Sequence, residues 1–442
     1  MPTTFRPYTP EQSLLLPPSP SDWLAEGHLA HFISDMIDQL DLSVFYERYE
    51  GDGRRKQPYE PRMMLKVLVY SYMTGTFSSR KIARRIEEDI ALRYLAAGNF
   101  PSHRTICDFR VDHLDAFGSV LVQIIRIAQE AGLVKLGRIA IDGTKVRANA
   151  SKHKAMSYDR MKSEEQKLEK EIADLLRQAA EEDAREDAEY GLDQRGDELP
   201  EELQRRESRL RKIREARDRL EQRQKEQDTK AGRKEGDDDP AQKKQPFKRK
   251  FGVPVGKAQE NFTDSDSRIM KSTEGFQQCY NGQIAVDGDH QIIVGAAVTQ
   301  NAADTASLLP MVELVEQNCR ATPEQLLADA GYKSEASFVE LERKQIDAHI
   351  ALGRERKNAA TTQTPRPTLP ATQRMKDKLA APPGEAAYRR RKAIVEPVFG
   401  WIKNILGFRR FSLRGTRKVA GEWALVCLVV NLKRMSALIG AA

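Results

Sequence analysis

Residues 138–145 read RIAIDGTK, a short β-branched run that ends abruptly in an acid followed by a glycine. Such a run predicts a buried strand. Asp142 then stands at the C-terminal end of that strand, which is where α/β proteins place their chemistry. We therefore expect the functional site to form around Asp142.

Two other acids occupy comparable places. Asp329 ends the apolar run in residues 325–332, QLLADAGY, and Glu396 lies within residues 391–399, RKAIVEPVF. We interpret the three acids as a two-metal phosphoryl-transfer site, because two divalent ions together can activate a nucleophile and neutralise a leaving oxygen. Carboxylates suit hard Mg²⁺, and the absence of a His/Cys cluster argues against zinc.

Further acids are numerous enough to supply a false triad. We predict that Asp287 and Asp289 are turn residues and that Asp304 caps a helix. Asp264 and Asp266 stay open, either as partners of the nearby Arg268 or as residues that line the site.

The charge of the chain is concentrated in one place. The net charge is +7, and residues 389–418 hold ten Lys and Arg against one acid. Such a patch favours a polyanionic partner, with a solvated cationic helix face as the alternative. The length of 442 residues predicts two or three domains.

The four cysteines are scattered and form no CxxC pair. This spacing argues against a disulfide framework or a zinc site and favours a reduced compartment. The start of the chain lacks the pattern of a signal peptide, and the longest apolar stretch, residues 423–432, is too short to span a bilayer. We expect a cytoplasmic protein without a membrane segment.

The N-terminal part is predicted to be helical. Residues 1–22 are expected to be an extended lead-in, and residues 23–132 repeat apolar positions at spacings of three and four. Short helices with arginines on one side are compatible with a DNA-binding module of the helix-turn-helix type. The alternative is an ordinary helical bundle with a basic face. The candidate DNA contacts here are Arg80, Arg84, Arg104 and Arg110.

Residues 153–250 change character. Apolar residues recur at steps of three, four and seven among Glu, Lys and Gln in two segments, with a break at residues 199–200 between them. We predict an antiparallel helical hairpin over 153–228, interpreted as a solvated spacer, and a poorly ordered linker from Asp228 to Lys250.

Beyond this insertion, strands return. The hairpin signal DGD at residues 287–289 joins two strands, and it is followed by a helix, the strand into Asp329, a helix, a strand near 346–352, a tract without regular structure around 359–372, and two closing helices. This order resembles that of a ribonuclease H-like fold. The predicted class is α/β, a mixed sheet with flanking helices in residues 133–152 and 251–442, interrupted by the hairpin and preceded by the all-α region.

The three acids, taken with their neighbours, resemble those of DDE transposases of bacterial insertion sequences. Asp142-Gly143-Thr144 resembles the segment of the first catalytic aspartate, and residues 328–332, ADAGY, resemble that of the second. Glu396 followed by Lys403 resembles the end of the signature Y-x2-R-x3-E-x6-K. The fit departs from that signature in its first half, because Tyr388 and Arg391 each lie one position early and Lys392 fills the arginine slot.

The resemblance implies an enzyme that cuts and joins DNA at the ends of an insertion sequence, by hydrolysis and then transesterification, with two Mg²⁺ ions for which Mn²⁺ can substitute. Its partners would be double-stranded DNA, as terminal inverted repeats and target, and a second copy of the chain in a homodimer. It would associate with the nucleoid when bound to DNA. The expected DNA contacts in the C-terminal part are Lys403, Arg391, Lys392, Tyr388, Arg409 and Arg410. The alternatives are a structure-specific nuclease of the same fold and a non-catalytic DNA-binding or scaffold protein.

Overall fold

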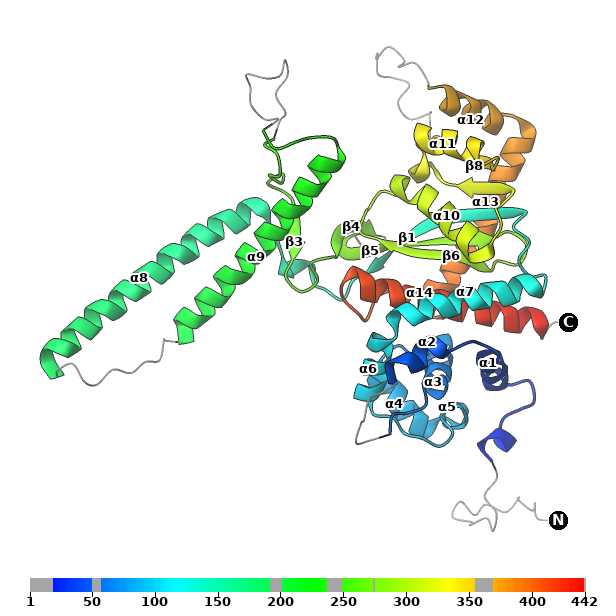
Figure 1. The fold of residues 1–442 in the computed structure, drawn as a ribbon, viewed down its shortest axis with the longest axis horizontal. Coiled ribbons are helices and arrows are strands. Elements are labelled where there is room, and N and C mark those ends of the chain that lie inside the picture. Colours follow the sequence, from blue (N-terminus) through cyan, green and yellow to red (C-terminus); the bar gives the residue numbers. More distant parts are fainter. Residues whose placement is uncertain are drawn as a thin grey trace, which may run out of the picture.

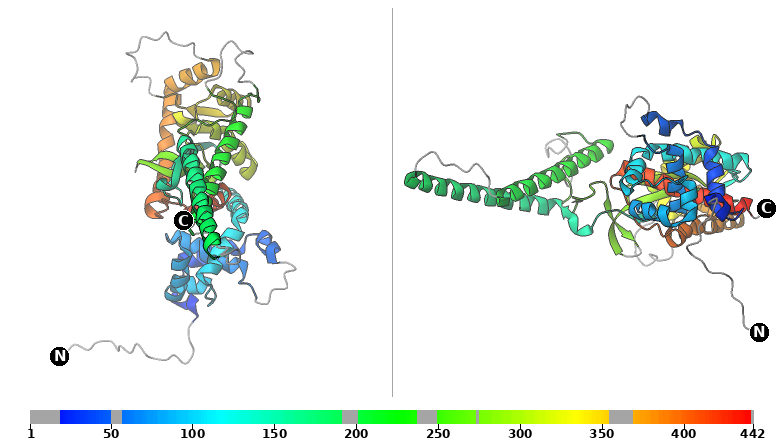
Figure 2. Two further views of the ribbon diagram at one scale, coloured as in Figure 1. Left: turned by 90° about the vertical axis from the view of Figure 1, so that its left-hand side faces the viewer. Right: turned by 90° about the horizontal axis from the view of Figure 1, so that it is seen from below.

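The structure is a computed structural model of the chain and describes residues 19–49, 57–190, 201–236, 249–272, 275–353 and 369–440. It consists of an N-terminal group of helices, a mixed sheet with covering helices, and a long helical hairpin that projects to one side (Figures 1 and 2). In the part of the chain described, no helix is both long enough and apolar enough to cross a membrane.

The N-terminal helices pack around α3, which is buried along most of its length. Pro61 stands in its first turn, and the Glu60 side chain caps the helix by accepting the Met63 N–H at 2.6 Å. The elements are η1 (Pro20–Trp23), α1 (Leu29–Asp38), α2 (Ser43–Tyr46), η2 (Glu47–Tyr49), α3 (Pro61–Met73), α4 (Ser79–Glu88), α5 (Ile90–Leu95), α6 (His103–Asp112) and α7 (Leu114–Glu130).

The sheet has six strands in the order β4-β5-β1-β7-β8, with β6 paired to β5. Strands β1, β7 and β8 run parallel, whereas β4, β5 and β6 pair in antiparallel fashion. The DGD signal is confirmed as the turn between β5 and β6. The strands are β1 (Arg138–Arg147), β4 (Arg268–Ser272), β5 (Gly275–Asp287), β6 (Ile293–Thr299), β7 (Gln325–Ala328) and β8 (Asp347–Ile350).

Helices cover both faces of the sheet. On one face, a Cβ added to Gly295 would meet Met311 and Val315 of α10. On the other face, Gly282 lies against Trp423, so α14 covers that side. The remaining helices of this part are η4 (Thr305–Ser307), α10 (Leu308–Cys319), η5 (Ala330–Tyr332), α11 (Glu335–Arg343), α12 (Pro370–Ala380), α13 (Pro382–Gly400), the π-helical η7 (Trp401–Ile405) and α14 (Thr416–Ile439).

The last helix joins the two halves of the molecule. Helix α14 runs beside α7 and contacts both β6 and α3 (Figure 1). One continuous hydrophobic core extends from Ala30 in α1 through the sheet to Met435 in α14. The N-terminal helices therefore share their core with the sheet.

The hairpin is confirmed and has a small core of its own. Helix α8 (Tyr158–Tyr190) packs against α9 (Glu201–Lys230), and the two-stranded sheet of β2 (Ala155–Ser157) and β3 (Gln259–Asn261) lies at its base. The pair extends away from the rest of the molecule in Figure 1 and in the right-hand view of Figure 2. Its buried side chains form a separate cluster of Tyr158, Met161, Leu168, Leu210, Ile213, Ala216 and Leu220.

Several sequence-based boundaries need correction. Strand β4 and helix α12 were not expected. The predicted linker starts too early, because Asp228 is buried and accepts the Gly252 N–H at 2.9 Å. The lead-in to residue 18, the break at 199–200, the linker over 237–248 and most of the tract at 359–372 lie outside the described residues.

Candidate active site at the end of the β1–β7 ladder

The parallel pairing of β1 and β7 brings two of the three predicted acids together. Ile141 pairs with Ala328 as the last pair of the ladder. Asp142 and Asp329 follow directly, so they lie side by side on strands about 4.8 Å apart. The Asp329 side chain accepts the Gly331 N–H at 2.8 Å, which fixes it over the turn after β7.

Asp142 carries an ion pair. Nη1 of Arg391, a buried residue of α13, donates to Oδ2 of Asp142 at 2.8 Å. Burial raises the pKa of Asp142 above its ordinary value, and the negative charge of Asp329 adds to this, whereas Arg391 and the Gly143 N–H oppose it. The predicted contact of Arg391 with DNA is thus replaced by a contact with the first acid.

Glu396 is placed differently from the two aspartates. It lies on α13, five residues after Arg391, so it points about 140° away around the helix axis. Its side chain is exposed. Within the described residues, no group of three or more His, Cys, Asp or Glu is arranged to hold a metal ion. The role of Glu396 as third acid stays a prediction.

A fourth acid lies at the site instead. Asp304 occupies the cap position of η4, but its side chain makes no cap hydrogen bond, so the predicted helix cap is wrong. Its Oδ1 accepts from Asn281 Nδ2 at 2.6 Å and from Gln283 Nε2 at 2.7 Å, both on β5. Lys145 Nζ lies 3.4 Å from the same oxygen. Asp304 therefore faces the sheet.

Glycine 331 separates Asp304 from Asp329. A Cβ on Gly331 would lie 2.9 Å from Asp329 Oδ1 and 3.3 Å from Asp304 Oδ2. A Cβ on Gly143 would lie 2.2 Å from Gln283 Nε2. Both glycines thus leave the room that the polar side chains occupy, which explains the pairing of Asp with Gly at these places.

Tyr332 reports the closeness of the three aspartates. Its buried hydroxyl donates to Gln283 Oε1. The pKa of Tyr332 is raised far above its ordinary value, first by burial and then by the negative charges of Asp304, Asp142 and Asp329. The three carboxylates therefore lie close enough to Tyr332 to affect its ionisation.

Beside the acids lies a positively charged pocket of about 300 Å³. It follows the edge of β1 beyond the end of β7, where Lys403 Nζ is 3.5 Å from the Lys145 carbonyl oxygen. Burial lowers the pKa of Lys403, and the charges of Arg409 and Lys145 lower it further. We call this the basic pocket; the described residues that line it are Lys145, Arg147, Ser272, Phe399, Gly400, Lys403, Asn404 and Arg409.

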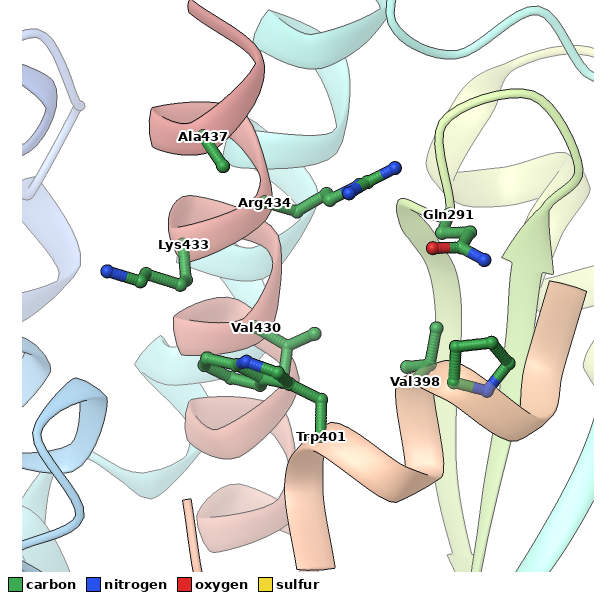
Figure 3. A pocket seen from close by; sticks show the side chains of 8 residues that line it. Gln291, Val398, Trp401, Val430, Lys433, Arg434 and Ala437 are labelled. Carbon is green, nitrogen blue, oxygen red and sulfur yellow. The ribbon is translucent and has the colours of Figure 1, made fainter. Parts of the chain in front are cut away.

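A second pocket, of about 240 Å³, lies between α14 and the end of α13 (Figure 3). Val398 and Trp401 face Val430 across it, with Gln291 at its side. Its described lining is mostly apolar and includes no acid, so it is not part of the candidate active site.

The other predicted residues are distributed over the surface and the core. Arg110 is buried and donates to the Tyr72 hydroxyl and the Phe77 carbonyl, each at 2.9 Å, so the prediction that it contacts DNA is wrong. Tyr388 is half-buried. Exposed positions on α4, α6, α13 and the segment after η7 are those of Arg80, Arg84, Arg104, Lys392, Arg409 and Arg410.

Three of the remaining acids have structural roles. Asp287 accepts the N–H groups of Leu136 and Asp289, as expected of a turn residue. Asp264 accepts the Gly415 N–H at 3.2 Å and Asp266 accepts the Thr416 N–H at 2.8 Å. These two aspartates thus hold the start of α14, which answers the question that the sequence left open about their role.

Comparison with protein families gives two matches. A model described as a transposase DDE domain matches residues 242–432, and one described as transposase domain (DUF772) matches residues 18–112. The first range contains Asp329 and Glu396, while Asp142 precedes it, on the other side of the hairpin. Searches of curated proteins and of solved structures give no match.

Proposed function

We propose, from the premise that the chain is a DDE transposase of an insertion sequence, that it cuts and joins DNA at the element's ends by two-metal phosphoryl transfer on a ribonuclease H-like fold. The observation that carries this proposal is the position of Asp142 and Asp329 directly after Ile141 and Ala328, the last pair of the parallel β1–β7 ladder. Hydrolysis at the end of the element would be followed by attack of the freed hydroxyl on target DNA.

The residues at the site fit divalent cations. Asp142 and Asp329 supply hard oxygen ligands from adjacent strands, which supports a cation between them. Glu396 is the proposed third ligand, which requires α13 to turn or bend so that the exposed carboxylate reaches the others. Two Mg²⁺ ions, or Mn²⁺ in their place, would activate the attacking oxygen and stabilise the leaving one.

The chain's own residues then have separate tasks. Arg391 holds the Asp142 carboxylate in place through its 2.8 Å contact. Lys403 and Arg409 of the basic pocket would bind backbone phosphates beside the acids. Further phosphate contacts are assigned to the exposed cations of α4, α6, α13 and the segment after η7, namely Arg80, Arg84, Arg104, Lys392 and Arg410.

The assembly is proposed to be a homodimer on two terminal repeats and target DNA. The hairpin of α8 and α9 projects beyond the rest of the chain, so it is placed to contact a second copy or the DNA flank (Figure 2). Its separate core means that such contacts need not disturb the sheet.

The test is cleavage by Asp142→Asn, Asp329→Asn and Glu396→Gln. Each change removes a ligand charge and keeps the shape, so Mg²⁺-dependent nicking should fall by orders of magnitude while DNA affinity stays nearly unchanged. Asp289→Asn in the exposed β5–β6 turn is the matched control. A variant that nicks at the normal rate would remove that acid from the proposal.

Joined donor and target DNA in the products separates the transposase from a structure-specific nuclease of the same fold. DNA binding without any cleavage by the unmodified protein would instead favour the non-catalytic alternative.

A further inference from the structure

Lys145 connects the acids to the basic pocket. It lies three residues after Asp142 on β1, lines the pocket, and has a side chain that is 20% exposed. Strand β1 extends beyond the last β7 pair at Ile141, so Lys145 stands on the part of the strand whose edge faces the pocket. Lys145 therefore stands beside any phosphate bound in the pocket.

Asp304 forms an ion pair with the Lys145 side chain. The 3.4 Å between Lys145 Nζ and Asp304 Oδ1 is longer than the roughly 2.8 Å of a tight charged hydrogen bond. The same oxygen already accepts from the amides of Asn281 and Gln283. The carboxylate is thus firmly anchored to β5, whereas its hold on the lysine is loose enough for the ammonium group to donate to a second acceptor.

The other oxygen of Asp304 points toward the acid site. It lies 3.3 Å from the Cβ position of Gly331, and Asp329 Oδ1 lies 2.9 Å from that same position. Asp304 therefore stands between the proposed metal ligand Asp329 and the cations of the basic pocket. A residue in this place can set the distance between Asp329 and those cations.

We propose that Lys145 binds the phosphate at the cleavage position and that Asp304 is a positioning residue for Lys145. This inference rests on the proposed function and adds two residues to it. The ammonium group donates to a non-bridging oxygen of the phosphodiester, and the anchored carboxylate determines where that ammonium stands. A purely structural ion pair is the competing explanation.

The experiment compares two DNA duplexes that carry the element's end, identified from the inverted repeats flanking the reading frame. One duplex has a neutral methylphosphonate in place of the phosphate at the cleavage position. Binding is measured without divalent ions, by fluorescence anisotropy, for the full chain. The unmodified protein should bind the methylphosphonate duplex roughly tenfold more weakly, which is the cost of one charged contact.

Lys145→Gln should bind both duplexes equally, at the weaker affinity, because the contact that distinguishes them is gone. Asp304→Asn keeps one oxygen acceptor for the β5 amides and removes the charge that places Lys145. It should lower the discrimination between the duplexes without an equal loss of affinity for both. Lys418→Gln, an exposed lysine outside the pocket, should discriminate as the unmodified protein does.

Full discrimination by Lys145→Gln would overturn the phosphate contact. If Asp304→Asn binds both duplexes more weakly by the same factor and still discriminates between them, Asp304 has a structural role only. Thermal unfolding of each variant tests whether it folds. Lys145→Gln should also still bind the duplexes, because its contacts with the rest of the DNA are unchanged. If the unmodified protein neither binds nor cuts the element's end, the proposed function itself fails, which is a different result.

Discussion

Replacing Arg391 with methionine should lower the free energy of unfolding, because the partly buried Asp142 carboxylate loses its cation. The guanidinium donates to Asp142 at 2.8 Å, and the two side chains are 10% and 19% exposed. Methionine retains much of the length and packing of the arginine stem but leaves the Asp142 carboxylate without its cation. The neighbouring Arg390 is exposed on the same helix, so Arg390→Met is the matched control.

The magnitude follows from this geometry. A hydrogen bond between charged groups contributes about 1.5–3 kcal/mol, and removing one partner of a fully buried pair costs about 3–5 kcal/mol. Because Asp142 keeps some contact with water, we expect a loss near the lower range, about 2 kcal/mol in the free energy of unfolding. The control should change by less than about 0.5 kcal/mol.

The loss should depend on pH in a defined direction. Burial raises the pKa of Asp142 above the ordinary 3.8, and Arg391 opposes that rise, so the pKa rises further in Arg391→Met. A raised pKa in the folded state means that stability is present below 3.8 and is lost as the pH rises through the folded value. The difference between variant and unmodified protein should therefore be largest at neutral pH and shrink in acid.

Urea unfolding in EDTA across this pH range provides the measurement. Adding Mg²⁺ should then stabilise Arg391→Met more than the unmodified protein, because arginine no longer competes for the Asp142 carboxylate. A destabilisation that matched Arg390→Met at every pH would refute the assigned ion pair. An equal response of both proteins to Mg²⁺ would argue against Asp142 as a metal ligand.

Three further predictions concern Gly331 in the turn after β7, the buried side chain of Glu422, and the hairpin of α8 and α9. Gly331→Ala should suppress cleavage with little change in the unfolding midpoint, because the added Cβ pushes on Asp329 and Asp304; normal nicking would contradict this. Glu422→Ala removes a buried carboxylate that accepts two backbone N–H groups and should cost about 3–5 kcal/mol in urea unfolding; a loss under about 1 kcal/mol would count against it. Replacing residues 158–230 with a Gly/Ser linker should leave a folded protein that nicks DNA, since the hairpin core is separate; circular dichroism and a strand-joining assay would show whether folding or only joining is lost.

The sequence predicted those elements whose signal is local and strong. Strands β1 and β7 each contain an apolar run that is followed by Asp, and the DGD turn marks β5 and β6. The predicted end of the first strand at Asp142 is wrong, because β1 continues to Arg147 along its pairing with β5. Strand β4 was missed because only Met270 of its five residues, Arg268–Ser272, is buried, at the edge of the sheet. Edge strands of this kind carry little hydrophobic pattern.

Two site errors have a common origin. Asp304 is of a residue type that often caps helices, but the amides that bind it come from β5, more than twenty residues earlier in the chain. Arg110 has the charge of a DNA contact, but Tyr72 and the Phe77 carbonyl take it into the core. Sequence reports charge and local propensity, whereas the partners of these side chains are set by tertiary packing.

The register of β1 explains how one strand serves both parts of the proposed site. Side chains alternate between the faces of a strand, so Asp142 and Lys145, three residues apart, point to opposite faces. Asp142 meets Arg391 on one face, while Lys145 meets Asp304 on the other. Both side chains can reach one DNA strand only along a free edge of β1, where no neighbouring strand is hydrogen-bonded to it. Strand β7 ends at Ala328, opposite Ile141, and the next described backbone partner on that edge is Arg410, which bridges to Arg147, so the edge is open between Asp142 and Val146.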